Sequence, residues 1–274
     1  MVIALLSAGC SDQATPTPPT RSLLQAGAGT TPAPARTSLA ATPTPSRTSS
    51  PTPTPTSPTP TRTATVAGID VSAYQPHVEW AAQRRSGVRF VWIKASEGTT
   101  WRSPHHATQR AGARAAGLFT GSYHYARPLG ATGAAQARAF LAAGGGWTAD
   151  GRTLPGALDL EKNTGDAAGG DPCYGLSPAR MRAWIRSFTT TYRTLTGRDA
   201  LIYVRADWWN RCTGSDTTLA ASNPLWLYDH EGVAGPLPAG WTRATVWQSG
   251  VRGGLDRNTF FGTEAQLRAW AAGS

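Results

Sequence analysis

The chain has 274 residues and a formal net charge of +10, and 12 of its 21 Pro lie before residue 61, whereas all 11 Trp lie after residue 79. No run approaches 18 apolar residues, which excludes an integral membrane protein. No period of 20 to 50 residues repeats, which argues against solenoids and propellers.

The first ten residues, MVIALLSAGC, indicate export. An apolar run followed by small residues and Cys10 resembles the lipobox of bacterial lipoproteins, in which the cysteine is lipidated after cleavage. Two features depart from that pattern, because no basic segment precedes the run and Ser7 stands where Leu is usual. The missing basic segment indicates that the natural chain starts upstream of Met1. An ordinary cleaved secretory signal is the alternative, so we expect a membrane-anchored lipoprotein or a secreted, wall-associated protein.

Residues 11–67 form a linker in which 28 of 57 residues are Pro or Thr and none is aromatic. Such a composition cannot bury enough apolar surface to offset its ordering entropy, so we expect it to be disordered. The remaining 207 residues, 68–274, suit one globular domain. This domain carries 22 basic and 15 acidic residues in no basic run. We expect no nucleic-acid partner, although an anionic polymer such as a cell wall fits the charge.

The domain alternates short apolar segments with helical ones. Repeated strand–helix alternation predicts a parallel sheet covered by helices, and at least seven strands favour an α/β fold of the irregular, flattened (β/α) barrel type. The predicted strands are 68–72, 89–96, 118–126, 156–161, 200–204, 225–228 and 245–248. The predicted helices are 78–86, 105–116, 134–143, 178–195 and 264–272, with Ser177 as the N-cap of the fourth.

Two cysteines remain in the domain, Cys173 and Cys212. An exported protein with two such residues favours one disulfide. Neither cysteine has a partner at metal-ligand spacing, so we expect no metal. A Gly-x-Gly-x-x-Gly motif, a P-loop and a Gly-x-Ser-x-Gly elbow are all missing from the sequence, so nucleotide binding and serine hydrolase chemistry have no support.

Polar residues gather at the predicted carboxyl ends of the strands, where a barrel holds its chemistry. Asp159 and Glu161 are separated by one residue, so on a strand both side chains face the same side. Two such carboxylates repel each other, which raises one pKa as a general acid requires. Glycoside hydrolysis uses this pairing, and Asp70 could add a third carboxylate. The alternative is an ion-pair network with Lys94, Lys162 or an arginine.

Aromatic rings stack on sugar faces, which gives Trp101, Trp226 and Trp247 a candidate role beside their alternative role in core packing. His105 and His106 are expected on a helix surface, and His77 at the exposed start of a helix. His124 lies at a strand end, where a place in the cleft and core packing are both open.

Eight segments in this order resemble glycoside hydrolase family 25 lysozymes, the Chalaropsis-type N,O-diacetylmuramidases, in their actinobacterial branch. They are GIDVSAYQ, FVWIKASEGTTW, GSYHYARP, ALDLEKN, ALIYV–DWWNRCTG, PLWLYDHEG, TVWQSG and LDRNTFFGT. The resemblance implies that Glu161 is the general acid and Asp159 its partner, that Asp70 and Asp256 are further active-site acids, and that Tyr125 lines the sugar site. Two departures are a short stretch between Trp247 and Asp256, which would displace Asp256, and the LYDHEG turn, which would alter a rim subsite.

The resemblance therefore implies a lysozyme that cleaves β-1,4 bonds between N-acetylmuramic acid and N-acetylglucosamine in peptidoglycan. A catalytically weak wall-binding module and a glycosidase of another N-acetylated polysaccharide are the alternatives. We expect a monomer that needs no cofactor and binds peptidoglycan glycan strands, with a membrane tether through Cys10. The candidate substrate-binding residues are Lys94, Glu97, Tyr123, Tyr125, Tyr203, Trp226, Trp247 and Gln248.

Overall fold

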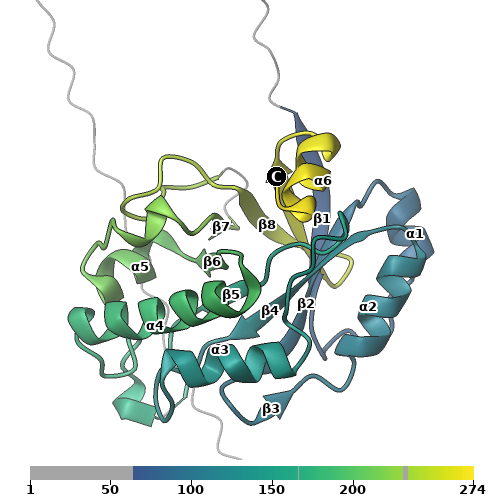
Figure 1. Ribbon diagram of the computed structural model, residues 1–274. Helices are drawn as coiled ribbons and strands as arrows, with labels where there is room; N and C mark the ends of the chain where they lie inside the picture. Colours follow the sequence, from purple (N-terminus) through teal and green to yellow (C-terminus); the bar gives the residue numbers. More distant parts are fainter. Residues whose placement is uncertain (1–63, 166, 231–233) are drawn as a thin grey trace, which may run out of the picture. The chain divides into compact units, whose positions relative to one another are not determined.

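The computed structural model describes residues 64–165, 167–230 and 234–274 (Figure 1). The predicted signal, Cys10 and almost all of the predicted linker lie outside these ranges. The first strand begins at Thr65, inside the span that the composition assigned to the linker. Among the described residues, no helix is long and apolar enough to cross a membrane.

The fold is an α/β barrel of eight strands, which confirms the predicted fold class (Figure 1). The barrel closes because β1 pairs with both β2 and β9, while the short β3 extends the end of β2. The strands are β1 (Thr65–Val71), β2 (Phe90–Glu97), β3 (Trp101–Arg102), β4 (Phe119–Tyr125), β5 (Ala157–Leu160), β6 (Leu201–Val204), β7 (Leu225–Tyr228), β8 (Val246–Arg252) and β9 (Leu255–Phe261).

Around the barrel, neighbouring strands are parallel from β1 through β2, β4, β5, β6 and β7 to β8, whereas β9 runs antiparallel to both of its neighbours. The short β3 is antiparallel to β2. A tight turn at Gly253 and Gly254, with φ of 63° and 72°, joins β8 to β9. Left-handed backbone at two successive positions is what a two-residue hairpin demands, and glycine adopts it without steric cost. The sequence analysis did not predict β9, because a hairpin strand lies outside the strand–helix alternation on which it relied.

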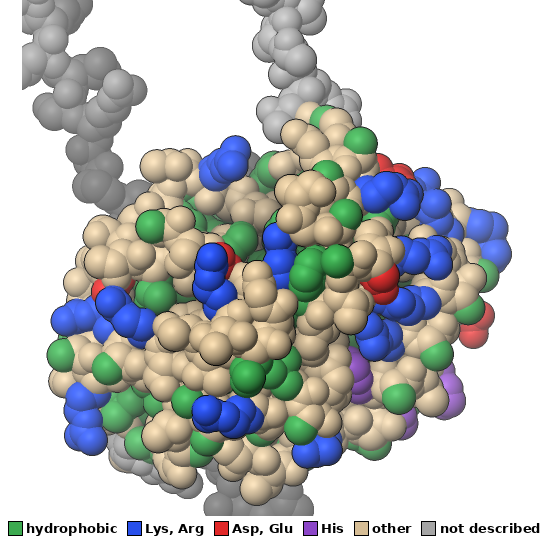
Figure 2. Space-filling view, in the orientation of Figure 1, with side chains coloured by type: hydrophobic (Ala, Val, Ile, Leu, Met, Phe, Trp, Pro, Cys, Tyr) green, Lys and Arg blue, Asp and Glu red, His purple; other side chains and the backbone are tan. Residues whose placement is uncertain are grey.

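The helices lie around the outside of the barrel (Figure 1). On the face seen in this view, Lys and Arg side chains are distributed over many places (Figure 2). All five predicted helices are present, and α5 and two 3₁₀ turns were not predicted. The helices are α1 (Trp80–Arg85), α2 (His106–Ala115), α3 (Gly133–Ala142), α4 (Pro178–Thr196), α5 (Ala206–Thr213) and α6 (Glu264–Ala272), and the 3₁₀ turns are η1 (Ala167–Gly170) and η2 (Leu219–Ala221).

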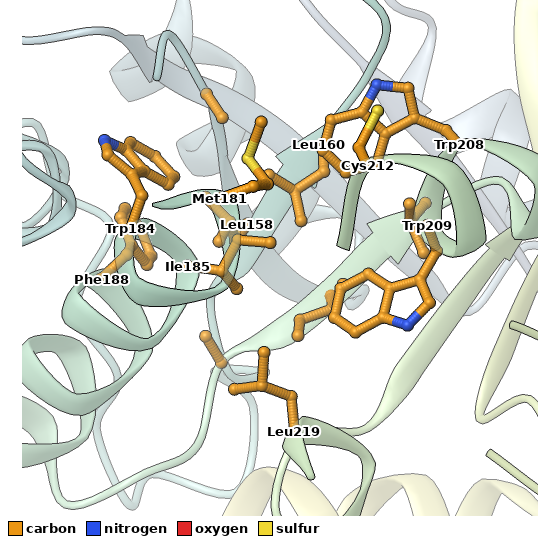
Figure 3. Packing of buried hydrophobic residues seen from close by; sticks show 14 of the residues in the cluster. Leu158, Leu160, Met181, Trp184, Ile185, Phe188, Trp208, Trp209, Cys212 and Leu219 are labelled. Atoms are coloured by element: carbon orange, nitrogen blue, oxygen red, sulfur yellow. The ribbon is translucent and has the colours of Figure 1, made fainter. Parts of the chain in front are cut away.

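Helix α4 shows how local sequence sets these elements. Its N-cap is Ser177, as predicted, whose hydroxyl accepts from the backbone NH of Arg180 at 3.4 Å. Pro178 follows at the first helical position, and Gly197 ends the helix in the left-handed conformation. The buried face repeats at helical spacing and packs on β5 and α5 (Figure 3); it includes Met181, Trp184, Ile185, Phe188 and Tyr192.

A second apolar layer fills the barrel interior. Trp92 and Trp226 are both buried there, with ring centroids 5.0 Å apart. Room for Trp92 comes from Gly121 on the neighbouring β4, because a Cβ at that position would lie 2.2 Å from the indole Nε1. Because the central strands are buried on both faces, their sequences are nearly continuous hydrophobic runs.

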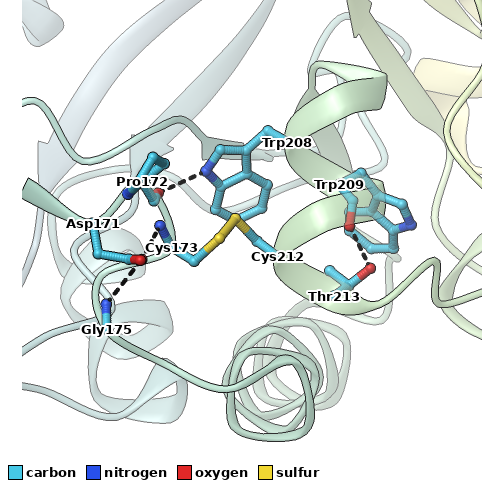
Figure 4. The surroundings of a disulfide bond; sticks show 8 residues. All are labelled: Asp171, Pro172, Cys173, Gly175, Trp208, Trp209, Cys212 and Thr213. Atoms are coloured by element: carbon cyan, nitrogen blue, oxygen red, sulfur yellow. Dashed lines mark hydrogen bonds between the residues drawn. A yellow bond between two sulfur atoms is a disulfide. The ribbon is translucent and has the colours of Figure 1, made fainter.

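The predicted disulfide between Cys173 and Cys212 is confirmed (Figure 4). It joins the loop after β5 to α5, with Cα atoms 5.2 Å apart and 39 residues of sequence separation. Beside it, the indole Nε1 of Trp208 donates to the carbonyl of Pro172 at 3.0 Å. The loop and the helix are therefore held together by a covalent bond and a hydrogen bond.

Candidate active site

A polar cavity of about 310 Å³ opens at the carboxyl ends of the barrel strands. Four carboxylates, one lysine and several aromatic side chains surround it. The residues that line it are Asp70, Ser72, Tyr74, Gln75, Lys94, Tyr123, Tyr125, Asp159, Glu161, Tyr203, Trp226, Tyr228, His230, Gln248 and Asp256.

Strand β5 delivers the central pair of carboxylates to this cavity. Asp159 is a strand residue and Glu161 follows the last strand residue, so their two-residue spacing turns both toward the interior. Asp159 is 5% exposed, and its Oδ1 has no hydrogen-bond partner among the described residues. A buried carboxyl oxygen without a partner is costly when it is charged, which favours the protonated form.

Burial raises the pKa of both members of the pair. The pKa of Asp159 lies well above its ordinary value, first because of burial and then because of the charge of Glu161. Burial also raises the pKa of Glu161, although its hydrogen bond with Asp159 and then the positive charge of Lys94 oppose the shift. The pair therefore favours holding a proton at a pH where isolated carboxyls have lost theirs, which is the condition for general acid chemistry.

Asp70 and Asp256 lie opposite each other in the register of β1 and β9. The Oδ2 of Asp70 accepts from the Nε2 of Gln248 at 2.8 Å and from the Nδ2 of Asn258 at 2.7 Å. Burial and the charge of Asp256 nevertheless raise the pKa of Asp70 to about 7. The short stretch before Asp256 forms the β8–β9 hairpin, and this hairpin brings Asp256 to the cavity.

Gln248 joins three sides of the cavity. While its Nε2 donates to Asp70, its Oε1 accepts from the hydroxyl of Tyr203 at 2.9 Å and from the Nε2 of His230 at 3.1 Å. Because the amide can satisfy all three partners in one orientation only, it holds them in a fixed arrangement.

The comparisons with known proteins agree on one family. Residues 69–253 match the model of glycosyl hydrolases family 25. Lysozyme M1 of Streptomyces globisporus is 44% identical over 75% of this chain and 71% of its own. The N,O-diacetylmuramidase of Chalaropsis sp. is 45% identical over 68% and 88%. A bacterial lysozyme structure from Streptomyces coelicolor superposes with a TM-score of 0.72 at 42% identity, covering 77% of this chain and 99% of that one.

The chain belongs to glycosyl hydrolases family 25. It is a glycoside hydrolase of the lysozyme, or muramidase, type, as its resemblance implied. The family match ends at residue 253, before β9, so Asp256 and Asn258 lie beyond the matched residues.

Six of the eight candidate substrate-binding residues of this family 25 enzyme line the cavity. Glu97 does not: its carboxylate pairs with the Nζ of Lys94 at 2.6 Å and with the Nη2 of Arg127 at 2.6 Å. Burial alone would raise the pKa of Glu97, but the hydrogen bonds and charges of these two cations lower it. Glu97 therefore holds Lys94 against the rings of Trp101 and Tyr125, at 5.0 and 4.5 Å from their centroids.

Trp247 was also expected at the cavity, and the structure places it elsewhere. Side chains alternate along β8, so the inward orientation of Gln248 turns Trp247 toward the outer helix-covered layer. Its Nε1 donates to the carbonyl of Asp229 at 2.8 Å. Trp226 does line the cavity, but at 2% exposure it forms the floor rather than an open stacking face.

The histidines divide between core and rim. The expectation that His106 lies on a helix surface is wrong, because its buried ring contacts the Ser122 hydroxyl at 2.9 Å. His124 is also in the core, away from the cavity. His230, Ser72, Tyr74 and Gln75 line the cavity and were missed. Asn258, which donates to Asp70, was missed as well. Within the described ranges, no group of three or more His, Cys, Asp or Glu could hold a metal ion.

Of these missed residues, one could have been predicted from a sequence pattern and the others could not. Asn258 follows Asp256 by two residues, so strand alternation would have paired them had β9 been recognised. His230, Ser72, Tyr74 and Gln75 lie in loops after β7 and β1, where no periodic pattern assigns a direction to a side chain.

Proposed function

We propose that this family 25 lysozyme hydrolyses the β-1,4 bond between N-acetylmuramic acid and N-acetylglucosamine in peptidoglycan. The observation that carries the proposal is the pair of buried Asp159 and half-buried Glu161 at the end of β5, inside a cavity lined by two further carboxylates. The printed names of its relatives, lysozyme and N,O-diacetylmuramidase, support the same bond.

In this proposal Glu161 protonates the glycosidic oxygen as the bond breaks. Asp159 either orients the acetamido group of the substrate, which then attacks from within the sugar, or supports an attacking water. Asp70 and Asp256 maintain the negative field that keeps a proton on the central pair, because nearby like charges oppose its loss. Lys94 limits this effect from the opposite wall.

The remaining lining residues would bind the glycan. Tyr125, Tyr203 and Gln248 present hydroxyl and amide groups to the cavity, and Tyr123 and Trp226 form an apolar floor. A cavity with apolar walls and a few fixed polar groups suits the alternating apolar and hydroxylated surfaces of a sugar ring.

The test is digestion of purified peptidoglycan followed by identification of the new reducing end. A muramidase releases N-acetylmuramic acid at the reducing terminus. New N-acetylglucosamine termini would instead identify a different glycosidase specificity. Binding to peptidoglycan without any new reducing end would identify a wall-binding module, and cleavage of another N-acetylated polysaccharide in preference would overturn the substrate assignment.

We also propose that the enzyme is exported and tethered to the membrane through a lipid on Cys10, which lies outside the described residues. The Cys173–Cys212 disulfide supports export, because such bonds persist in oxidising compartments. The full-length product should partition with membranes, and Cys10→Ala should release it or block its processing. A native protein that is fully soluble and begins downstream of Cys10 would overturn the tether and leave secretion as the route.

A further inference from the structure

A second groove of about 590 Å³ adjoins the catalytic cavity. It shares Glu161, Tyr203 and Tyr228 with that cavity, so the two spaces meet at the proposed general acid. One wall is the loop after β5, ending at Pro172, and the other is α5 with Trp208. Any group lying in this groove would therefore project from the substrate close to the bond that breaks.

The charge of the groove is opposite to that of the cavity. Three cations, Lys162, Arg205 and Arg211, and two carboxylates, Glu161 and Asp207, line it, so its net charge is positive. Arg205 pairs with Asp207 at 3.0 Å and lies 5.4 Å from the ring centroid of Tyr228. Lys162 and Arg211 are exposed and form no ion pair with the described acidic residues. Two cations are thus left for a ligand, which must be anionic.

The two walls are held at a set separation. The Cys173–Cys212 disulfide joins the residue after Pro172 to α5, and the Trp208 indole bridges the same walls through its bond to the Pro172 carbonyl (Figure 4). Because the groove already has its shape before a ligand binds, ordering its walls costs little free energy. Its cations can therefore select for a particular substituent of the substrate.

We infer that this groove binds a carboxylate carried by the muramic acid side of the glycan, with Lys162 and Arg211 as its partners. The inference rests on the proposed function, because the continuity with Glu161 requires the anion to be part of the substrate. Its carboxylate has two sources, the lactyl group of muramic acid and the peptide attached to it. Ammonium and guanidinium groups form charge-assisted hydrogen bonds with either.

The test compares three soluble substrates with one glycan backbone. The first keeps its peptides, the second has every carboxyl converted to a neutral amide, and the third has lost its peptides and keeps only the lactyl carboxylate. In the first substrate the lactyl carboxyl is bound in the amide to the peptide, so only the third substrate offers a lactyl carboxylate. Lys162→Gln/Arg211→Gln should lower, by about tenfold, the ratio of kcat/KM on one carboxylate-bearing substrate to that on the second substrate. A fall on the first substrate assigns the peptide carboxylate, and a fall on the third assigns the lactyl one.

Arg138→Gln is the matched control, since Arg138 is exposed on α3 and lines neither space; its ratio should equal that of the wild type. If the double variant hydrolyses the glycan and leaves both ratios unchanged, first to second substrate and third to second, the groove proposal is overturned and the proposed function stands. If the wild type releases no muramic acid ends, the proposed function fails. In that case the groove is tested by binding alone. The ratio of the dissociation constants of the carboxylate-bearing and amidated substrates is compared between the wild type and the double variant.

Discussion

The molecule contains two buried polar clusters that the same fold treats differently. One is the acidic cavity, where Asp159 keeps an oxygen without a described partner and the carboxyl pKa values are raised. The other surrounds His124 on β4, on the side that α3 covers. There the Nδ1 of His124 contacts the Ser96 hydroxyl at 2.8 Å, and its Nε2 donates to the Oε1 of Gln136 on α3 at 3.0 Å. In the second cluster both ring nitrogens of His124 have partners, whereas in the first the buried Asp159 keeps one oxygen without a described partner.

The difference separates reactive polar groups from structural ones. Burial lowers the pKa of His124 to about 4, so the ring stays neutral and stacks on Phe188 with centroids 5.3 Å apart. A neutral ring with both nitrogens bonded stabilises the core, and it does not change its protonation state near neutral pH. In the acidic cavity, burial raises the pKa values of Asp159 and Glu161, and a side-chain hydrogen bond joins the two carboxyl groups. The pair can therefore hold a proton and pass it to a substrate.

The strongest way to break the comparison is to remove the proton donor. Glu161→Gln keeps the shape of the side chain but cannot donate, so peptidoglycan turnover should fall by at least about 10²–10⁴-fold. Asp159→Asn should also be severe, and the two losses should not add, because both residues serve one transition state.

Release of reducing sugar from purified peptidoglycan measures both effects, with circular dichroism to verify folding. Glu79→Gln, an exposed carboxylate outside the cavity, is the matched control and should retain wild-type turnover. A well-folded Glu161→Gln enzyme that still clears peptidoglycan near the wild-type rate would refute the assignment.

Removing the disulfide should lower the stability of the domain and change the chemistry of the acid pair little. In the chain-entropy model, a loop of about this length contributes roughly 4 kcal/mol to the free energy of unfolding. Cys173→Ser/Cys212→Ser should therefore unfold at a clearly lower denaturant midpoint, as should the reduced wild type. Equal midpoints for oxidised and reduced protein would show that the bond does not stabilise the domain.

For the His124 cluster we expect the opposite outcome, a loss of stability without a loss of turnover. His124→Ala leaves a cavity and removes the partner of Ser96 and Gln136, which should lower the free energy of unfolding by about 2–4 kcal/mol. Turnover per folded molecule should stay near that of the wild type. Urea titration and assay at low temperature separate the two quantities, and the exposed His77→Ala should change neither. A large loss of turnover without loss of stability would move His124 into the active site.

The smallest expected effect is a change in pH dependence at Asp70. Its pKa rises from 3.8 to about 7 on folding, so the folded state binds the proton more tightly. Between these values the free energy of unfolding must fall as pH rises, because the unfolded state has already lost its proton. Asp70→Asn should flatten this slope, measured as the melting temperature from pH 4 to pH 8. An identical slope in the variant would assign the pH dependence to other carboxylates.

Strand–helix alternation sufficed to predict the barrel. It also sufficed for the acid pair, because Asp159 lies in the short strand β5 and Glu161 follows it with period-two spacing. The failures have local causes. Trp247 and Gln248 are adjacent, and only the register of β8 decides which of them faces inward. Glu97 was assigned to the cavity because strand position cannot show that Lys94 and Arg127 draw its carboxylate away.

The closure of the barrel links the two ends of the described chain. Thr65 on β1 pairs with Phe261 on β9, so the first strand keeps an open edge until the last strand has been made. Pairing between such distant residues is slow, because a long loop must close before any contact compensates for its lost entropy. Asp70 and Asp256 meet on these same two strands, so the acidic cavity is completed only when the barrel itself closes. A truncated chain that lacks β9 therefore has neither a closed barrel nor a complete set of acids, so hydrolytic competence depends on the strand that is made last.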